Sequence, residues 1–133
     1  QLMVFTKIIH SFCKEQQDKP GMAPFVTKLA ELNKEWGEIT GKLGEKAMAN
    51  ADEVGAASVD YLMYAGYVSL AYMWARMASV ALDGDADDAF LKAKVQTANF
   101  YYQRILPRTE AHKIAMLNGA DSLMDMPEDA FAF

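Results

Sequence analysis

Cysteine is nearly absent from the 133-residue sequence, because Cys13 is the only one. An internal disulfide bond is therefore excluded, and a reduced, cytoplasmic setting is the natural expectation. Basic residues are also scarce, with 13 Lys and Arg against 18 Asp and Glu and a formal net charge of −5. Without a cluster of cations, the sequence predicts no binding to nucleic acid or to an anionic membrane surface.

Histidine is the second scarce residue, since the sequence holds only His10 and His112. A di-iron site in a helical bundle needs Glu-x-x-His pairs on facing helices, and no such pair occurs. Glu110 precedes His112 by two residues, which puts the two side chains on different faces of a helix. We therefore predict no metal-binding residues and interpret both histidines as partly exposed surface residues.

Motifs for nucleotide binding are missing as well. No G-x-G-x-x-G follows a strand, and no P-loop occurs. Cys13 lies three residues after His10, so that a Cys–His contact on one helix face is one interpretation. The favoured interpretation is a small buried apolar residue. The sequence thus predicts no catalytic and no cofactor-binding residues in this chain.

The hydrophobic pattern predicts helices throughout, because no segment alternates apolar and polar residues over the length of a strand. A first helix is expected over about 2–17 and ends at the Asp18–Gly21 break. A second helix is expected over 24–50, where apolar residues recur at intervals of four and three. These residues are Phe25, Leu29, Leu32, Trp36, Ile39 and Leu43.

A third helix is predicted from Glu53 or Ala57 to Leu82, and it is apolar nearly all round. Between Tyr61 and Leu82 the only charge is Arg76, and this length is sufficient to span a bilayer. A charge well inside the run is costly in a membrane, so a buried central helix is favoured and no membrane span is predicted. Asp60 and Arg76 then need ionic partners on other helices. The alternative for Arg76 is binding of a phosphate or carboxylate, and a structural ion pair is favoured.

A fourth helix is expected to start within 85–88, where an aspartate caps it, and to kink or break at Pro107. Helicity resumes over 108–123, and the tail over 124–133 is expected to be irregular. The fold class is therefore all-α, an up-and-down antiparallel four-helix bundle whose last helix is kinked or broken at Pro107. We expect residues 1–133 to form a single domain.

Two groups of residues on the predicted helices leave alternatives open. Glycines inside a helix each cost about 1 kcal/mol relative to alanine, so we expect them to let another helix approach closely. They are Gly37, Gly41, Gly44 and Gly66. Aromatic residues crowd the third helix and form either a ligand pocket or, as we favour, core and interface. They are Tyr61, Tyr64, Tyr67, Tyr72 and Trp74.

Three stretches, 54–78, 94–107 and 118–124, carry a family resemblance. They include Trp74-Ala75-Arg76-Met77-Ala78 and the pattern F-Y-x-x-x-x-L-P over Phe100–Pro107. The sequence resembles the acetyl-CoA-dehydrogenase-like C-terminal domain, a helical module appended to a subgroup of bacterial acyl-CoA dehydrogenases. The resemblance spans nearly the whole chain, and neither signature is a catalytic motif.

The resemblance implies that the chain is an accessory domain, a fragment of a longer chain that oxidises acyl-CoA to 2-enoyl-CoA. FAD is expected in the parent chain and no cofactor in this fragment, which is itself not catalytic. The implied partners are the dehydrogenase core of the same chain and further copies in a homo-oligomer. One alternative is a free-standing helical bundle that binds a small apolar ligand. A metalloenzyme bundle is disfavoured by the missing Glu-x-x-His pairs.

Overall fold

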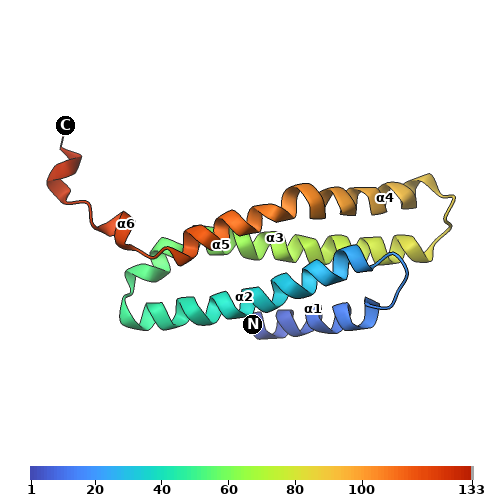
Figure 1. Cartoon of the computed structure of the whole chain (residues 1–133), viewed down its shortest axis with the longest axis horizontal. Coiled ribbons are helices and arrows are strands. Elements are labelled where there is room, and N and C mark those ends of the chain that lie inside the picture. The colour runs from blue at the N-terminus through green and yellow to red at the C-terminus, as the bar shows by residue number, and fades with distance from the viewer. Residues whose placement is uncertain (133) are drawn as a thin grey trace.

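The computed structural model describes residues 1–132 and contains helices but no strand in that range. The long helices are α1 (Leu2–Gln16), α2 (Ala23–Ala49), α3 (Asp52–Asp83) and α4 (Ala89–Phe100), and α5 (Thr109–Leu117) continues the line of α4. Helices α1, α2 and α3 form one column each, and α4 with α5 forms the fourth and last column. Neighbouring columns in the chain run antiparallel, and α1 lies along only one half of α2 (Figure 1). The predicted all-α, up-and-down bundle of four helical columns is confirmed.

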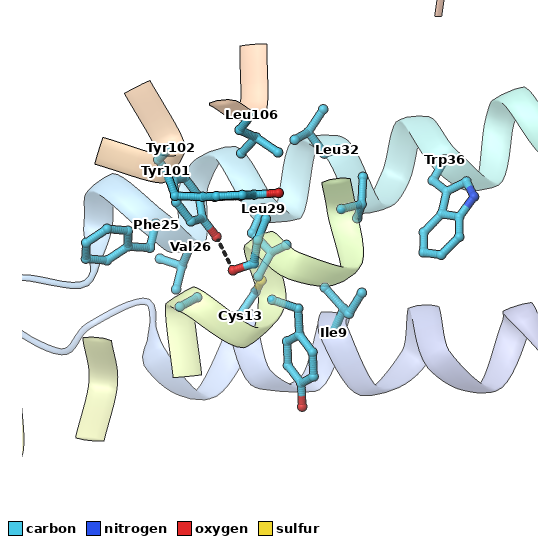
Figure 2. Close-up of a cluster of buried hydrophobic side chains, with 14 of the residues drawn as sticks. Ile9, Cys13, Phe25, Val26, Leu29, Leu32, Trp36, Tyr101, Tyr102 and Leu106 are labelled. Carbon is cyan, nitrogen blue, oxygen red and sulfur yellow. Dashed lines mark hydrogen bonds between the residues drawn. The ribbon is translucent and has the colours of Figure 1, made fainter. Parts of the chain in front are cut away.

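The core is built around the predicted apolar seam of α2. Five residues of this seam are at most 5% exposed, namely Phe25, Leu29, Leu32, Trp36 and Ile39. The sixth, Leu43, is half-buried. The facing side of α3 carries small side chains between larger ones, and α1 adds Ile9 and Cys13. Figure 2 shows side chains of α1, α2 and the segment around Tyr101–Leu106 converging on one cluster. The spacing of four and three residues therefore identified the buried face of α2.

The start of α4 follows the capping prediction. The Asp88 side chain accepts hydrogen bonds from the backbone N–H groups of Phe90, at 2.8 Å, and Leu91, at 3.2 Å. These bonds satisfy donors that the first helical turn leaves without a backbone partner. One aspartate of the predicted group thus fixes where the fourth column begins.

The predicted disruption at Pro107 is found, but it extends over eight residues. A π-helical turn, Tyr101–Ile105, and a 3₁₀ turn, Leu106–Arg108, separate α4 from α5. Proline has no N–H group, and in a regular α-helix its ring crowds the carbonyl four residues earlier. The backbone widens ahead of Pro107, and the Leu106 N–H donates to the Tyr101 carbonyl five residues back.

The last column is shorter than predicted. Helix α5 ends at Leu117 instead of near Leu123, because Gly119 adopts a φ of +87°, a conformation that terminates helices. The Lys46 ammonium donates to the Leu117 carbonyl at 3.0 Å, and Glu53 accepts from the Ala120 N–H at 3.3 Å. Residues of α2 and α3 therefore hold the end of α5 in place.

Beyond this point the chain leaves the bundle (Figure 1). A short helix α6 (Asp121–Met124) and a 3₁₀ turn (Glu128–Phe131) follow, and all their side chains are exposed. The tail that we expected to be irregular over 124–133 thus contains one helical turn, and Phe133 lies outside the described residues.

We expect Leu32→Ala to lower the free energy of unfolding by about 2–5 kcal/mol, because it removes a side chain that is 1% exposed and leaves a cavity. Urea denaturation followed by circular dichroism measures this change. Leu62→Ala is the matched control, since Leu62 is 71% exposed on α3 and its truncation should change stability by less than about 0.5 kcal/mol. Equal losses in the two variants would contradict the assignment of the core.

Candidate functional site

One face of α3 carries a row of exposed apolar side chains. They recur at intervals of three and four residues, as on one side of a helix, and are between 37% and 71% exposed. We call this row the α3 outer stripe; it comprises Val59, Leu62, Met63, Leu70, Met73, Met77 and Val80. The prediction that α3 is buried on all sides is therefore wrong for this face. A continuous apolar surface of this kind is typical of an interaction site.

Two cations lie beside the stripe where α3 faces α4. A groove of about 400 Å³ there is lined mainly by apolar side chains, with Arg76 and Lys94 among them. The Arg76 guanidinium lies 5.7 Å from the ring centre of Tyr72, and the Lys94 ammonium lies 5.0 Å from that of Phe90. In the described part of the chain, no carboxylate pairs with Arg76. The predicted ion pair is therefore wrong, and the guanidinium lies over the ring of Tyr72 instead.

A second groove runs between α2 and α3, beyond the first residue of α1. It has a volume of about 630 Å³ and is almost entirely apolar. We call it the α2–α3 groove; its lining comprises Thr40, Leu43, Gly44, Ala47, Val54, Ala57, Ser58, Tyr61, Leu62 and Ala65. The Tyr61 hydroxyl hydrogen-bonds to Thr40 Oγ1 at 2.8 Å and accepts from Trp36 Nε1 at 3.2 Å, so the polar groups along it are already paired.

Most of the tyrosines belong to the core, as favoured from the sequence. The hydroxyls of Tyr101 and Tyr102 donate to the α3 carbonyls of Tyr67 and Ala71, each at 2.8 Å. Burial raises the pKa of both phenols well above the ordinary value, so they remain protonated donors at neutral pH. These residues join the last column to α3, and Tyr61 is the tyrosine that reaches the α2–α3 groove.

The expectation that Asp60 needs a partner from another helix is confirmed. Asp60 Oδ1 lies 2.8 Å from His112 Nδ1 on α5, and the His112 ring lies 5.7 Å from the ring of Tyr67. His112 is therefore partly exposed, as predicted, but it belongs to the interface between α3 and α5, where it pairs with Asp60. In the sequence, an isolated aspartate on an apolar helix indicated that Asp60 needs a partner. The sequence did not indicate which residue that partner is.

A second polar cluster joins three helices. The Glu35 carboxylate on α2 accepts from the Tyr64 hydroxyl at 2.7 Å and from the Lys113 ammonium at 2.9 Å. Burial alone would raise the pKa of Glu35, but the hydrogen bonds from Tyr64 and Lys113 and the charges of Lys113 and Lys28 hold this pKa below its usual value. The carboxylate is thus fixed in its charged form and links α2 to α3 and α5.

Cys13 lies in the core, and its thiol is not activated. Burial raises the pKa of Cys13 to about 11, so the thiol is protonated at neutral pH, whereas a nucleophilic cysteine needs its thiolate. His10, the candidate base one turn earlier, is exposed, and no hydrogen bond between it and Cys13 occurs among the described residues. The structure therefore places Cys13 in the small, buried role that the sequence favoured.

The two grooves described above are lined mainly by apolar side chains. Residues 1–132 hold no group of three or more His, Cys, Asp or Glu side chains placed to bind a metal ion. A dinucleotide needs several donors that converge on its pyrophosphate, whereas the groove walls are apolar and both cations of the α3–α4 groove lie over aromatic rings. A search for a membrane span likewise finds no helix of sufficient length and hydropathy in this range.

We expect Glu35→Gln to lower the free energy of unfolding at pH 7 by about 1–3 kcal/mol, because the amide replaces a charged acceptor of two hydrogen bonds. The folded-state pKa of Glu35 is depressed below 4.5, so its contribution is present above that pH and is lost as the pH falls through the folded-state value. The difference between wild type and variant should therefore shrink at pH 3, as urea denaturation at both pH values would measure.

Glu38→Gln provides the control for this experiment. Glu38 is exposed on the same helix and lies 3.8 Å from Lys34. Such a surface pair contributes little, so we expect a change below about 0.5 kcal/mol at either pH. A loss in Glu35→Gln that is the same at pH 7 and pH 3 would contradict the proposed role of the charged carboxylate.

The described residues thus form a helical bundle with an exposed apolar stripe on α3 and an open apolar groove between α2 and α3. No curated protein matches the sequence. The family described as "Acetyl-CoA dehydrogenase C-terminal like" matches residues 5–127, which is nearly the whole helical part of the structure. The chain therefore belongs to the acetyl-CoA dehydrogenase C-terminal-like family.

Proposed function

We propose that the chain is the C-terminal accessory domain of an FAD-dependent acyl-CoA dehydrogenase, and that it packs against the dehydrogenase core of its own polypeptide. The observation that carries the proposal is the α3 outer stripe on a member of this family. From Val59 to Val80 the stripe extends over about 30 Å of helix. An apolar surface of this length matches a permanent interface better than a transient one.

The composition of the stripe supports a permanent protein contact. Its side chains are Val, Leu and Met, with no charged residue among them. Methionine adapts its shape to irregular partners, and Gly66, between Met63 and Leu70, leaves space in which a partner side chain fits. Such a surface is stabilised when it is covered, which supports packing on the core and assembly into a homo-oligomer.

The chemistry of the proposed enzyme belongs to the core of the parent chain. When bound there, FAD accepts the hydride as acyl-CoA is oxidised to 2-enoyl-CoA. We assign the catalytic base and the flavin site to that core, and a structural role to this chain. We place the enzyme in the bacterial cytoplasm and in fatty acid metabolism, where acyl-CoA thioesters are the substrates.

The proposal is tested on the complete polypeptide encoded by the gene. We expect it to purify with the yellow absorbance of bound flavin, which bleaches when an acyl-CoA substrate is added without an electron acceptor. A polypeptide that binds no flavin, or whose flavin no acyl-CoA reduces, would overturn the assignment to a dehydrogenase.

The role of the stripe is tested by Leu70→Glu in the same polypeptide. Burying a carboxylate without a partner costs several kcal/mol, so we expect roughly tenfold or greater loss of turnover or a smaller particle in light scattering. Ile114→Glu is the control, because Ile114 is comparably exposed on α5, away from the stripe. Equal behaviour of the two variants would show that the stripe is not the interface.

A further inference from the structure

The α2–α3 groove continues the surface on which α1 lies. Helix α1 runs antiparallel to α2 and covers α2 and α3 together, because the Phe5 ring lies 6.1 Å from Trp36 and 5.7 Å from Tyr72. Near the same level, Asn33 Nδ2 donates to the Thr6 carbonyl at 2.9 Å. Figure 1 shows α1 starting near the middle of α2, while α2 and α3 continue side by side beyond it.

The same faces of both helices continue into the groove. On α2, small residues recur at intervals of four and three, namely Val26, Ala30, Asn33, Gly37, Thr40, Gly44 and Ala47. The first three of these lie beside α1, and the last three line the groove. On α3, Tyr72 and Ser79 contact α1 side chains, and Ser58 and Ala65 lie seven residues apart on the same face and line the groove. One uninterrupted surface thus serves α1 and extends past its first residue.

This extension has the shape that receives a helix. Gly37 and Gly44 have no atom within 4 Å of the place where a Cβ would stand, among the described residues. We predicted that these glycines let another helix approach closely, and no described helix does so. Glycine within a helix is destabilising relative to alanine and allows a backbone to come near. The width of the groove therefore suits a helix packed at short distance against α2 and α3.

We propose that the polypeptide directly preceding Gln1 continues α1 as one helix and fills the α2–α3 groove, antiparallel to α2. This inference rests on the proposed function, because a longer parent chain supplies the segment. A helix in line with α1 covers the groove with about ten residues. From the contact between Thr6 and Asn33, Gly44 comes opposite a residue about six positions before Gln1.

The groove favours this occupant over a second copy of the chain. Helix α1 begins beyond the near end of the groove (Figure 1), so a helix from another molecule would meet α1 end to end, whereas a continuous helix has no such junction. The groove walls are apolar, and the hydroxyls of Tyr61 and Thr40 already bond to each other. The segment therefore presents an amphipathic helix with its apolar side towards α2 and α3.

The test compares two cysteine variants of the complete polypeptide, Gly44→Cys and Gly41→Cys. Both glycines lie within α2 with open space at the Cβ position, but only Gly44 lines the groove. Site-specific maleimide labelling, read by mass spectrometry, should be at least tenfold slower at position 44 than at position 41. A cysteine placed about six residues before Gln1 should also form a disulfide bond with Gly44→Cys under mild oxidation.

Each other outcome overturns the proposal. Equal labelling at the two positions means that the groove is open in the complete chain. Protection of position 44 that appears only at high protein concentration means that a second copy fills the groove. Protection without the disulfide, when cysteines at the neighbouring upstream positions also fail to react, means that another segment fills it. None of these readouts depends on flavin or turnover, so failure here is distinguishable from failure of the proposed dehydrogenase function.

Discussion

The close contact between α2 and α3 is the constraint on which the other elements depend. Large side chains on α2, such as Phe25 and Leu29, share one buried cluster with the small Ala71 and Ala75 of α3. Small residues on one side and large ones on the other allow two long helices to run side by side at native packing density. Helix α1 and the last column then pack against α2 and α3. The ridges of side chains on α2 and α3 determine where these two elements lie.

The sequence was sufficient for the helices and for the buried seam, because both depend on local periodicity and on capping residues such as Asp88. It was not sufficient for contacts between distant segments. The partner of Asp60 is His112 on α5, and nothing in the spacing of either residue specifies that pair. Arg76 was expected to need a carboxylate, but a side chain on the outer face keeps its charge in water and lies over Tyr72.

The largest surprise was the exposed face of α3. A helix that is apolar all round predicts burial on all sides, and the prediction assumed that the other helices of the same chain provide it. Those helices leave the stripe through Leu70 and Met73 exposed. The glycines of α2 likewise lack a neighbour that the sequence predicted. Gly44 leaves room for a closely packed helix, and no described residue fills that room. Periodicity thus identifies a surface to be covered but not the segment that covers it.

The π turn at Tyr101–Ile105 sets the rotational phase of everything that follows it. A π turn holds one residue more than an α turn, and one residue corresponds to roughly 100° of rotation about the helix axis. With that residue removed, Pro107 would still interrupt the helix, and α5 would present a different face to the bundle. His112 and Lys113 would turn away from Asp60 and Glu35, so one inserted residue keeps two polar pairs in register.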